Sequence, residues 1–455
     1  MGISDKERRI MFLALMLGMV ITSMATTAIS NALPLIMDDM AISAGTAQWL
    51  VSGFTLAAGI MIPATPFLIR KLKNKTLFIL AIALCAAGSI LASFASAFAV
   101  VLIARILQGF GCGIIMSFVQ VMILAIYPKE RHGSIMGIYG LGCMVAPIAA
   151  PTVFGIIIDH MGWHMMFIVF FVLSVISILF ALPAVKNVMP VKPAQFDTLS
   201  MILSAAGFCG ILIGTGNMSS FPFLHFATGL PFILGAAALF AFSLKQVRGT
   251  RRLLDLSVFR NKNFAFAAIL SVLLYFVLLG NTTLLPLFIQ SMRGMSATEY
   301  ALITLPGSAL SAIVTVFAGR IFDRGAKKSL FAAGMLLAAA GCAVRIVSGA
   351  DTGILNMALS NILISAGSGC VMMPLTALGL GGLGELRADG AAIVTTLRQM
   401  AGAIGAAAGV AVMSTAASHF DGNGYAGISA AYIFFTALSA AGLILSLFFF
   451  KKSVK

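Results

Sequence analysis

The sequence contains few charged residues, and acidic residues are fewer than basic ones. Only 9% of its 455 residues are charged, whereas 60% are hydrophobic and the mean hydropathy is +1.06. This composition excludes an ordinary soluble domain and is typical of a protein that crosses a membrane many times. Six cysteines stand singly in apolar segments, without the spacing of metal ligands or of a disulfide framework. The sequence also lacks a Walker motif and a catalytic constellation, so we expect no enzyme, no cofactor and no metal site.

Long apolar runs occupy most of the chain. Fourteen of them reach about 20 residues, the length that spans the hydrocarbon core of a bilayer as a helix. The sequence therefore predicts an all-α polytopic membrane protein with 14 transmembrane helices.

Basic residues cluster in alternate connections between these runs. The 29 lysines and arginines against 14 acids give a formal net charge of +15. The connections of the opposite set contain only Arg293, with Arg345 near a helix end. By the positive-inside rule the basic set is cytoplasmic, and both termini belong to it. Because topology explains the charge, we expect no nucleic-acid partner.

The segment from residue 102 to residue 155 holds the most informative polar residues. Arg105 stands inside an apolar run with no acid nearby in sequence. A charge in hydrocarbon costs roughly 2.5 kcal/mol or more, and normally faces a cavity or a partner; snorkelling near a helix end is the alternative. Prolines and glycines permit a bend in the following run, at Gly142, Pro147, Pro151 and Gly155.

These two runs resemble the motifs of the drug:proton antiporters of the major facilitator superfamily. The stretch from Arg105 to Gly113 is similar to the family's R-x-x-Q-G-x-G-x-G element, whose arginine is implicated in proton coupling. The run around Pro147 is similar to the antiporter motif, with Ala150 and Phe154 where glycine is usual. The resemblance implies exchange rather than symport, with Arg105 in proton coupling and the second run as a hinge.

A loop of the same superfamily occurs twice. After the tenth run, GRIFDRGAKK resembles its gating loop, and the matching positions are Gly319, Asp323, Arg324 and Gly325. After the second run, Arg70 replaces the aspartate of that loop, so the acid that normally caps a neighbouring helix is missing there. The repetition indicates an internal duplication.

Acids are absent from the predicted middle of the membrane. The stretch TTAISNALP in the first run resembles the family's first-helix motif, but Ala25 occupies the position where an aspartate is common. A proton-coupled carrier needs a titratable group that both sides can reach in turn. The candidates, all at the ends of runs, are Asp39, Asp159, His160, His164 and Glu385, and Asp39 and Asp159 are the first to test. An ordinary interfacial role for each, with a driving ion other than the proton, is the alternative.

Further stretches resemble the fourteen-span branch of this family. They are GWHMMF at 162–167, LLDLSVFRNKNF at 253–264 and TLRQMAGAIG at 396–405. The resemblance implies the major facilitator fold, divided into a six-helix bundle over 1–185, two inserted transmembrane helices with a cytoplasmic linker over 186–262, and a second six-helix bundle over 263–455.

The resemblance also implies secondary active efflux of hydrophobic or cationic drugs, in exchange for protons, by a monomer in the bacterial cytoplasmic membrane. The partners are then small molecules, protons and the lipid bilayer. The 26 methionines suit a cavity that adapts to varied shapes. We expect polar side chains to line it, namely Asn31, Gln120, Asn281 and Asn361, although each could instead bond a neighbouring helix. The alternatives are an exporter of one amphipathic lipid or metabolite, and a transporter-like sensor without turnover.

Overall fold

The computed structural model describes residues 4–191, 197–217, 225–248, 253–347, 349, 352–420 and 423–449. Within these ranges the regular structure is helical and contains no strand. Fourteen of the helices described there are long and apolar enough to cross a membrane, which confirms the predicted number. The first span continues beyond a break at Ala28 into α2 (Ile29–Asp39).

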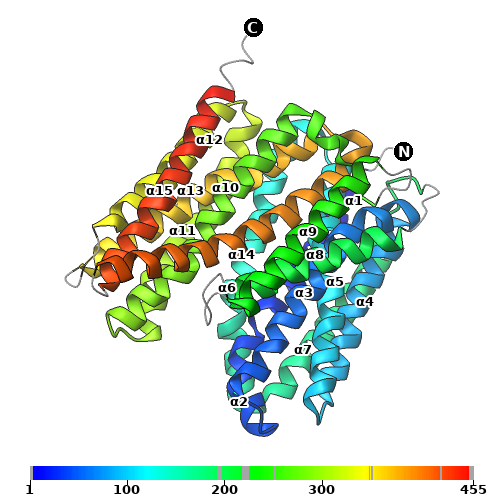
Figure 1. Ribbon diagram of the computed structural model, residues 1–455. Coiled ribbons are helices and arrows are strands. Elements are labelled where there is room, and N and C mark those ends of the chain that lie inside the picture. Colours follow the sequence, from blue (N-terminus) through cyan, green and yellow to red (C-terminus); the bar gives the residue numbers. More distant parts are fainter. Residues whose placement is uncertain are drawn as a thin grey trace.

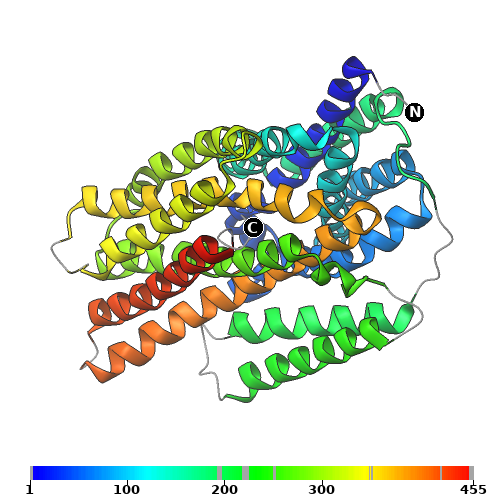
Figure 2. The ribbon, with the colours of Figure 1, turned by 90° about the horizontal axis from the view of Figure 1, so that it is seen from above.

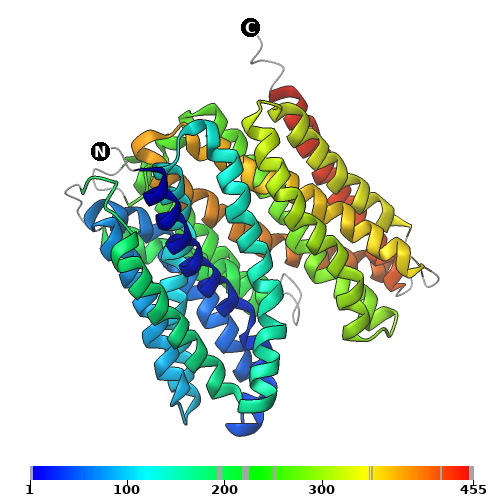
Figure 3. The same cartoon turned by 180° about the vertical axis from the view of Figure 1, so that it is seen from behind.

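The helices form two bundles of six spans each (Figures 1 and 3). Besides α2, the first bundle consists of α1 (Asp5–Thr27), α3 (Ala44–Lys71), α4 (Asn74–Ser93), α5 (Phe98–Ile126), α6 (His132–Met161) and α7 (Trp163–Ala184). The second consists of α10 (Lys262–Pro286), α11 (Ala297–Asp323), α12 (Lys327–Ile346), α13 (Ile354–Gly381), α14 (Arg387–His419) and α15 (Gly424–Phe449). Short helical segments are η1 (Lys129–Arg131), η2 (Leu256–Arg260), η3 (Leu287–Met292) and η4 (Gly384–Leu386).

Two further spans, α8 (Thr198–Asn217) and α9 (Phe226–Arg248), lie between the bundles in the chain. They pack on each other and run along the outside of the molecule beside α14 (Figure 2). Glycines make the pair tight, since a Cβ on Gly210 would lie 2.6 Å from the Cα of Gly235. These are the two inserted helices of the predicted architecture; the division of the chain at residues 185 and 262 stays a prediction.

Glycines also hold α5 at the centre of the first bundle. A Cβ on Gly113 would lie 2.3 Å from the carbonyl oxygen of Ala58 on α3. On another face of α5, a Cβ on Gly111 would lie 2.3 Å from the carbonyl oxygen of Ala81 on α4. Backbone therefore packs on backbone at both contacts, as small residues permit between membrane helices, and this packing fixes the position of every side chain that α5 presents.

One end of the molecule gathers the basic connections, and we call it the basic end; it comprises residues 70–75, 129–131, 324–328 and 387. Helix α1 begins and α15 ends on this side, at the top of Figure 1. The connection that follows α7 returns there too, because the side chain of Asn74 accepts hydrogen bonds from the backbone N–H groups of Val188 and Met189, each at 2.9 Å.

A first prediction concerns this packing. Gly113→Val should push α5 away from α3 and lower the free energy of unfolding by about 1–3 kcal/mol, because added methyl groups overpack a close contact. Gly216→Val is the matched control, since a Cβ at Gly216 meets no heavy atom within 4 Å. Thermal unfolding in detergent compares the two variants, and equal melting temperatures would contradict the packing argument.

Candidate functional site

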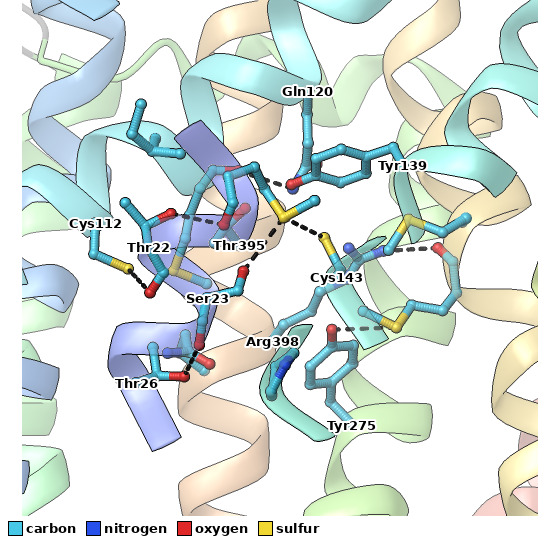
Figure 4. A pocket seen from close by; sticks show the side chains of 17 residues that line it. Thr22, Ser23, Thr26, Cys112, Gln120, Tyr139, Cys143, Tyr275, Thr395 and Arg398 are labelled. Atoms are coloured by element: carbon cyan, nitrogen blue, oxygen red, sulfur yellow. Dashed lines mark hydrogen bonds between the residues drawn. The ribbon is translucent and has the colours of Figure 1, made fainter. Parts of the chain in front are cut away.

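A cavity of about 230 Å³ lies where the two bundles meet (Figure 4). Helices α1, α5 and α6 of the first bundle line it, together with α10, α13 and α14 of the second. A site walled by both halves can be opened from either side when the halves rock, which is the geometry that alternating access requires.

The lining of this cavity is soft and weakly polar. Methionines contribute from both bundles, namely Met19, Met116, Met372 and Met373. Three of its six hydroxyl groups come from α1, on Thr22, Ser23 and Thr26, and the others belong to Tyr139, Tyr275 and Thr395. Methionine side chains are flexible and polarizable, so they repack around ligands of different shape. Such a lining suits an apolar small molecule with few polar groups.

Arg398 of α14 is the only charged residue among those that line the cavity, and none of the lining residues is acidic. Its Nη2 donates to Thr376 Oγ1 (2.7 Å), Ser271 Oγ (3.1 Å) and the Met372 carbonyl (3.3 Å). The guanidinium lies 5.3 Å from the ring centre of Tyr275 (Figure 4). Arg398 was not among the predicted site residues, although the sequence carried the same signal as for Arg105: a lone arginine inside an apolar run.

Of the four predicted cavity residues, Gln120 alone lines this cavity. Its Nε2 donates to the Met116 carbonyl, 3.0 Å away and one turn earlier in α5. Asn31 lies instead beside α6, where a Cβ on Gly155 would be 3.1 Å from its Nδ2.

The other two amides take part in contacts between helices. Asn281 of α10 accepts a hydrogen bond from the hydroxyl of Tyr432 on α15 (2.7 Å). Asn361 of α13 donates to the Thr304 carbonyl on α11 (3.3 Å). Both are buried and lie outside the residues that line the cavity. The structure thus places them in the alternative role, that of buried amides bonded to a neighbouring helix.

Arg105 connects three helices of the first bundle and is only 1% exposed. Its Nη1 donates to the carbonyl of Ala25 on α1 (3.1 Å) and to Oε1 of Gln108 (2.7 Å). Its Nε donates to the Leu50 carbonyl on α3 (3.2 Å), and the guanidinium lies 4.2 Å from the ring centre of Phe54. An arginine enclosed in this way does not snorkel to the membrane surface.

The break in the first span explains the contact between Arg105 and Ala25. Ala25 lies in the last turn of α1, where backbone carbonyls lack intrahelical partners and carry partial negative charge. A carbonyl therefore receives the guanidinium at the position where the family's aspartate is common. Gln108 is held in turn by Ser89 of α4, whose Oγ accepts from its Nε2 at 2.9 Å.

The residues of the predicted hinge in α6 pack against α1. A Cβ on Gly142 would lie 2.5 Å from the Cε of Met16. The carbonyl of Pro147 accepts a hydrogen bond from Thr27 Oγ1 (3.1 Å), and Pro147 also lines the cavity. The side chain of Pro151 lies outside the described part of the structure. The contact of α6 with α1 therefore reaches the cavity wall, where a change in helix bend would alter the cavity's shape.

The predicted gating loop closes the basic end at one contact between the bundles. Asp323, the last residue of α11, accepts from the backbone N–H groups of Gly133 and Ser134 (2.7 Å each) and from Ser134 Oγ (2.5 Å). These are unpaired donors in the first turn of α6, where a carboxylate is also favoured by the helix dipole. A Cβ on Gly319 would lie 2.2 Å from the Gly133 carbonyl, so the crossing needs glycine.

The last two residues of the gating loop turn the chain after α11. Gly325 has φ +92°, in the left-handed region that favours glycine. Arg324 caps the helix and is exposed.

The corresponding loop of the first bundle, after α3, also contacts the other bundle, but its contact residue is a base and not an acid. Arg70, near the end of α3, donates from Nη1 to both carboxylate oxygens of Asp389 (2.8 and 3.0 Å) and from Nη2 to the Leu253 carbonyl (2.9 Å). Asp389 lies in the first turn of α14, is fully buried, and accepts from the Asp255 backbone N–H as well (3.0 Å). The loop itself lacks the acid, as the sequence shows, and α14 supplies an acid to the contact from its own first turn.

A third contact joins the bundles at the same end. Arg387, the first residue of α14, donates from Nη1 to the carbonyl of Leu124 near the end of α5 (2.8 Å). With three such contacts the basic end is closed, whereas the two bundles diverge toward the opposite end in Figures 1 and 3.

The two predicted proton-carrying acids lie at helix ends away from the cavity. Asp39 ends α2, is exposed, and accepts from the indole N–H of Trp163 (3.2 Å). Asp159 is exposed near the end of α6. Neither lines the cavity.

Two six-helix bundles around a shared cavity, with a closed gate at one end, define a membrane transporter. The sequence model of the Major Facilitator Superfamily matches residues 15–406, and the chain belongs to that superfamily. It is 33% identical to the MFS-type transporter YcnB of Bacillus subtilis (strain 168) over 95% of this chain and 93% of the relative. It is 30% identical to the lincomycin resistance protein LmrB of the same organism, over 97% and 95%.

Solved structures agree on the fold. The proton:xylose symporter XylE superposes with a TM-score of 0.68 over 97% of this chain and 95% of that one, at 14% sequence identity. This similarity supports the major facilitator fold and, at such low identity, the fold alone.

The gate contact gives a second prediction. Arg70→Ala leaves the Asp389 carboxylate buried without its cation, which costs about 3–5 kcal/mol and should shift the population toward an open basic end. Spin labels placed at exposed Lys73 and Glu385 would report a longer distance in this variant. Lys71→Ala removes a neighbouring exposed charge and should leave the distance unchanged; the same distance in both variants would contradict the role given to Arg70.

Arg105 gives a third prediction. Arg105→Ala should abolish transport, because the carbonyls of Ala25 and Leu50 lose their donor and the junction of α1, α3 and α5 loosens. Arg105→Lys should insert into the membrane but not restore transport, since a point charge cannot reproduce the planar fork. Transport assays normalised to membrane-inserted protein check both, and normal transport by Arg105→Ala would show that Arg105 is not needed.

Proposed function

We propose that this transporter exports hydrophobic small molecules, antimicrobial compounds among them, by alternating access. The observation that carries the proposal is the cavity between the bundles, with its methionine-rich lining and walls from both halves. Such a lining accepts ligands of varied shape. The lincomycin resistance of LmrB is the property in that relative's name, and it makes efflux of antimicrobials the first activity to test.

The proposal places the protein in a bacterial cytoplasmic membrane as a monomer, with the basic end and both termini in the cytoplasm. The positive-inside rule supports this orientation, and the relatives are bacterial. In this orientation the structure represents an outward-facing state, since the basic end is closed by Asp323, Arg70 and Arg387. Rocking that breaks these three contacts would open the cavity to the cytoplasm.

Proton exchange is the proposed energy source, with Arg105 in the coupling and Asp39 and Asp159 as the acids to test. Moving a cation out against an inside-negative potential costs about 2.3 kcal/mol per charge per 100 mV, so export of cations has to be coupled. If cations are exported, we expect an edge acid to be essential, with Asp39 or Asp159 the first to test, because the described cavity lining contains no acid.

A second candidate function is export of one defined amphipathic lipid or metabolite. The cavity volume of about 230 Å³ is less than the roughly 300–1,000 Å³ typical of pockets for drug-sized ligands, which favours a small metabolite over a lipid. The altered loop after α3 is no longer an argument for a sensor without turnover, because Arg70 of that loop still forms a contact between the bundles.

Drug susceptibility of a host that lacks its own exporters tests the proposal. Expression of the wild type should raise the inhibitory concentration of lincomycin or of other compounds in a panel of neutral, anionic and cationic drugs. Arg105→Ala should not protect, whereas Arg260→Ala, which removes an exposed arginine of η2, should protect fully. Equal susceptibility with and without expression across the panel would contradict export.

Inverted membrane vesicles test the coupling. A pH gradient alone should drive uptake of an exported cation, and Asp39→Asn together with Asp159→Asn should remove that uptake. Accumulation that persists in this double variant after a protonophore, with no other ion gradient, would show the coupling proposal to be wrong.

A further inference from the structure

We propose that the cavity takes hydrophobic organic anions, and that Arg398 binds their charged group. The ligand class is an apolar body with a carboxylate, phosphate or sulfonate. The proposal rests on the export function above and names the charge of its substrate.

Arg398 differs from the other arginines buried in this fold. Arg105, Arg345 and Arg398 are each 4% exposed or less, and none forms an ion pair with an acid in the described residues. Arg105 and Arg345 bond backbone carbonyls and polar side chains and contact aromatic rings away from the cavity, although each also has one buried nitrogen without a partner. Arg398 alone of the three lines the cavity, where its charge has no counter-ion.

Arg398 and its neighbour Thr395 each have a polar atom without a hydrogen-bond partner. All three hydrogen bonds of Arg398 use Nη2, and its Nε is buried without a partner. Thr395 lies three residues earlier on the same side of α14, also lines the cavity, and its Oγ1 is likewise buried without a partner. A buried donor left unpaired is costly. An anionic group in the cavity would supply the counter-ion that Arg398 lacks, and hydrogen bonds between charged groups are the strong ones.

The remainder of the cavity suits the apolar part of such a ligand. Tyr275 and Met372 flank the guanidinium, and the methionines of α1 and α5 lie across the cavity. A cationic ligand would meet the like charge of Arg398 in a site without an acid. An organic anion has a further advantage, since an inside-negative membrane potential drives it outward. The absence of acids from the cavity lining then favours an anionic substrate, because an acid there would repel it.

Binding to the purified full-length protein tests the proposal with three probes of matched shape. They are 1-naphthylacetate, its neutral amide 1-naphthylacetamide, and the cation 2-(1-naphthyl)ethylammonium, measured by equilibrium dialysis at neutral pH. We expect the acid to bind at least about tenfold more tightly than the amide, and the ammonium to bind most weakly.

Substitutions at Arg398 locate the effect. Arg398→Gln should weaken binding of the acid by about ten- to a hundredfold and leave binding of the amide unchanged. Arg398→Lys keeps the positive charge and should retain the preference for the acid, which guards against a folding defect in the glutamine variant. Arg345→Gln, a buried arginine outside the cavity, is the matched control and should leave the affinity ratio of acid to amide unchanged.

Competition identifies the source of the anion. The concentrations at which dihexanoylphosphatidate and unlabelled naphthylacetate displace labelled naphthylacetate are compared. A lower concentration for the phosphatidate assigns the site to a lipid headgroup, and a lower concentration for naphthylacetate assigns it to soluble organic acids. Both outcomes support the proposal. Equal binding of the three probes, including no binding at all, would overturn it. Export of neutral or cationic drugs without anion binding would overturn this inference alone, whereas no export of any compound overturns the proposed function.

Discussion

A guanidinium group inside a membrane has to be surrounded by acceptors, and in this protein backbone carbonyls and aromatic rings replace carboxylates. Arg105 uses the carbonyls of Ala25 and Leu50 and the face of Phe54. The break of the first span at Ala28 makes the Ala25 carbonyl part of a helix terminus, and glycines of α5 bring its neighbours within reach. The core of the first bundle therefore depends on a single buried cation for which helix packing, rather than an acid, provides the partners.

The gate at the basic end contains two related contacts, and the loop residue that makes the contact is an acid in one and an arginine in the other. Asp323 caps α6 directly, whereas Arg70 reaches α14 through Asp389, an acid in that helix's own first turn. Both arrangements place a carboxylate of the second bundle at a helix N-terminus. They differ in that Asp323 caps a helix of the first bundle, whereas Asp389 lies in the first turn of its own helix and binds an arginine of the first bundle. Each contact is strong when formed and leaves a buried carboxylate or unpaired backbone donors when broken. Such contacts favour two discrete positions of the bundles over a range of intermediate ones, as alternating access needs.

Hydropathy, loop charge and local motifs predicted the number of spans, the family and the gate at Asp323, because each depends on residues close together in sequence. The pair of Arg70 and Asp389 is separated by 319 positions, and only the packed bundles bring it together. For Asn281 and Asn361 the choice between cavity and helix contact depends on helix rotation, which an almost uniformly apolar run does not specify. Arg398 was visible in the sequence as a lone charge, but its direction toward the cavity followed only from the contacts of α14 with α10 and α13.

The central claim is that the two bundles alternate around one cavity and carry a ligand across the membrane. Substrate counterflow in proteoliposomes tests it most directly, because it needs a ligand, a gradient of unlabelled ligand and no other energy source. We expect that vesicles preloaded with an exported compound transiently accumulate the labelled compound above its equilibrium level, and that protein-free vesicles do not. Saturable binding without counterflow in the wild type would contradict transport by alternating access and identify the protein as a sensor.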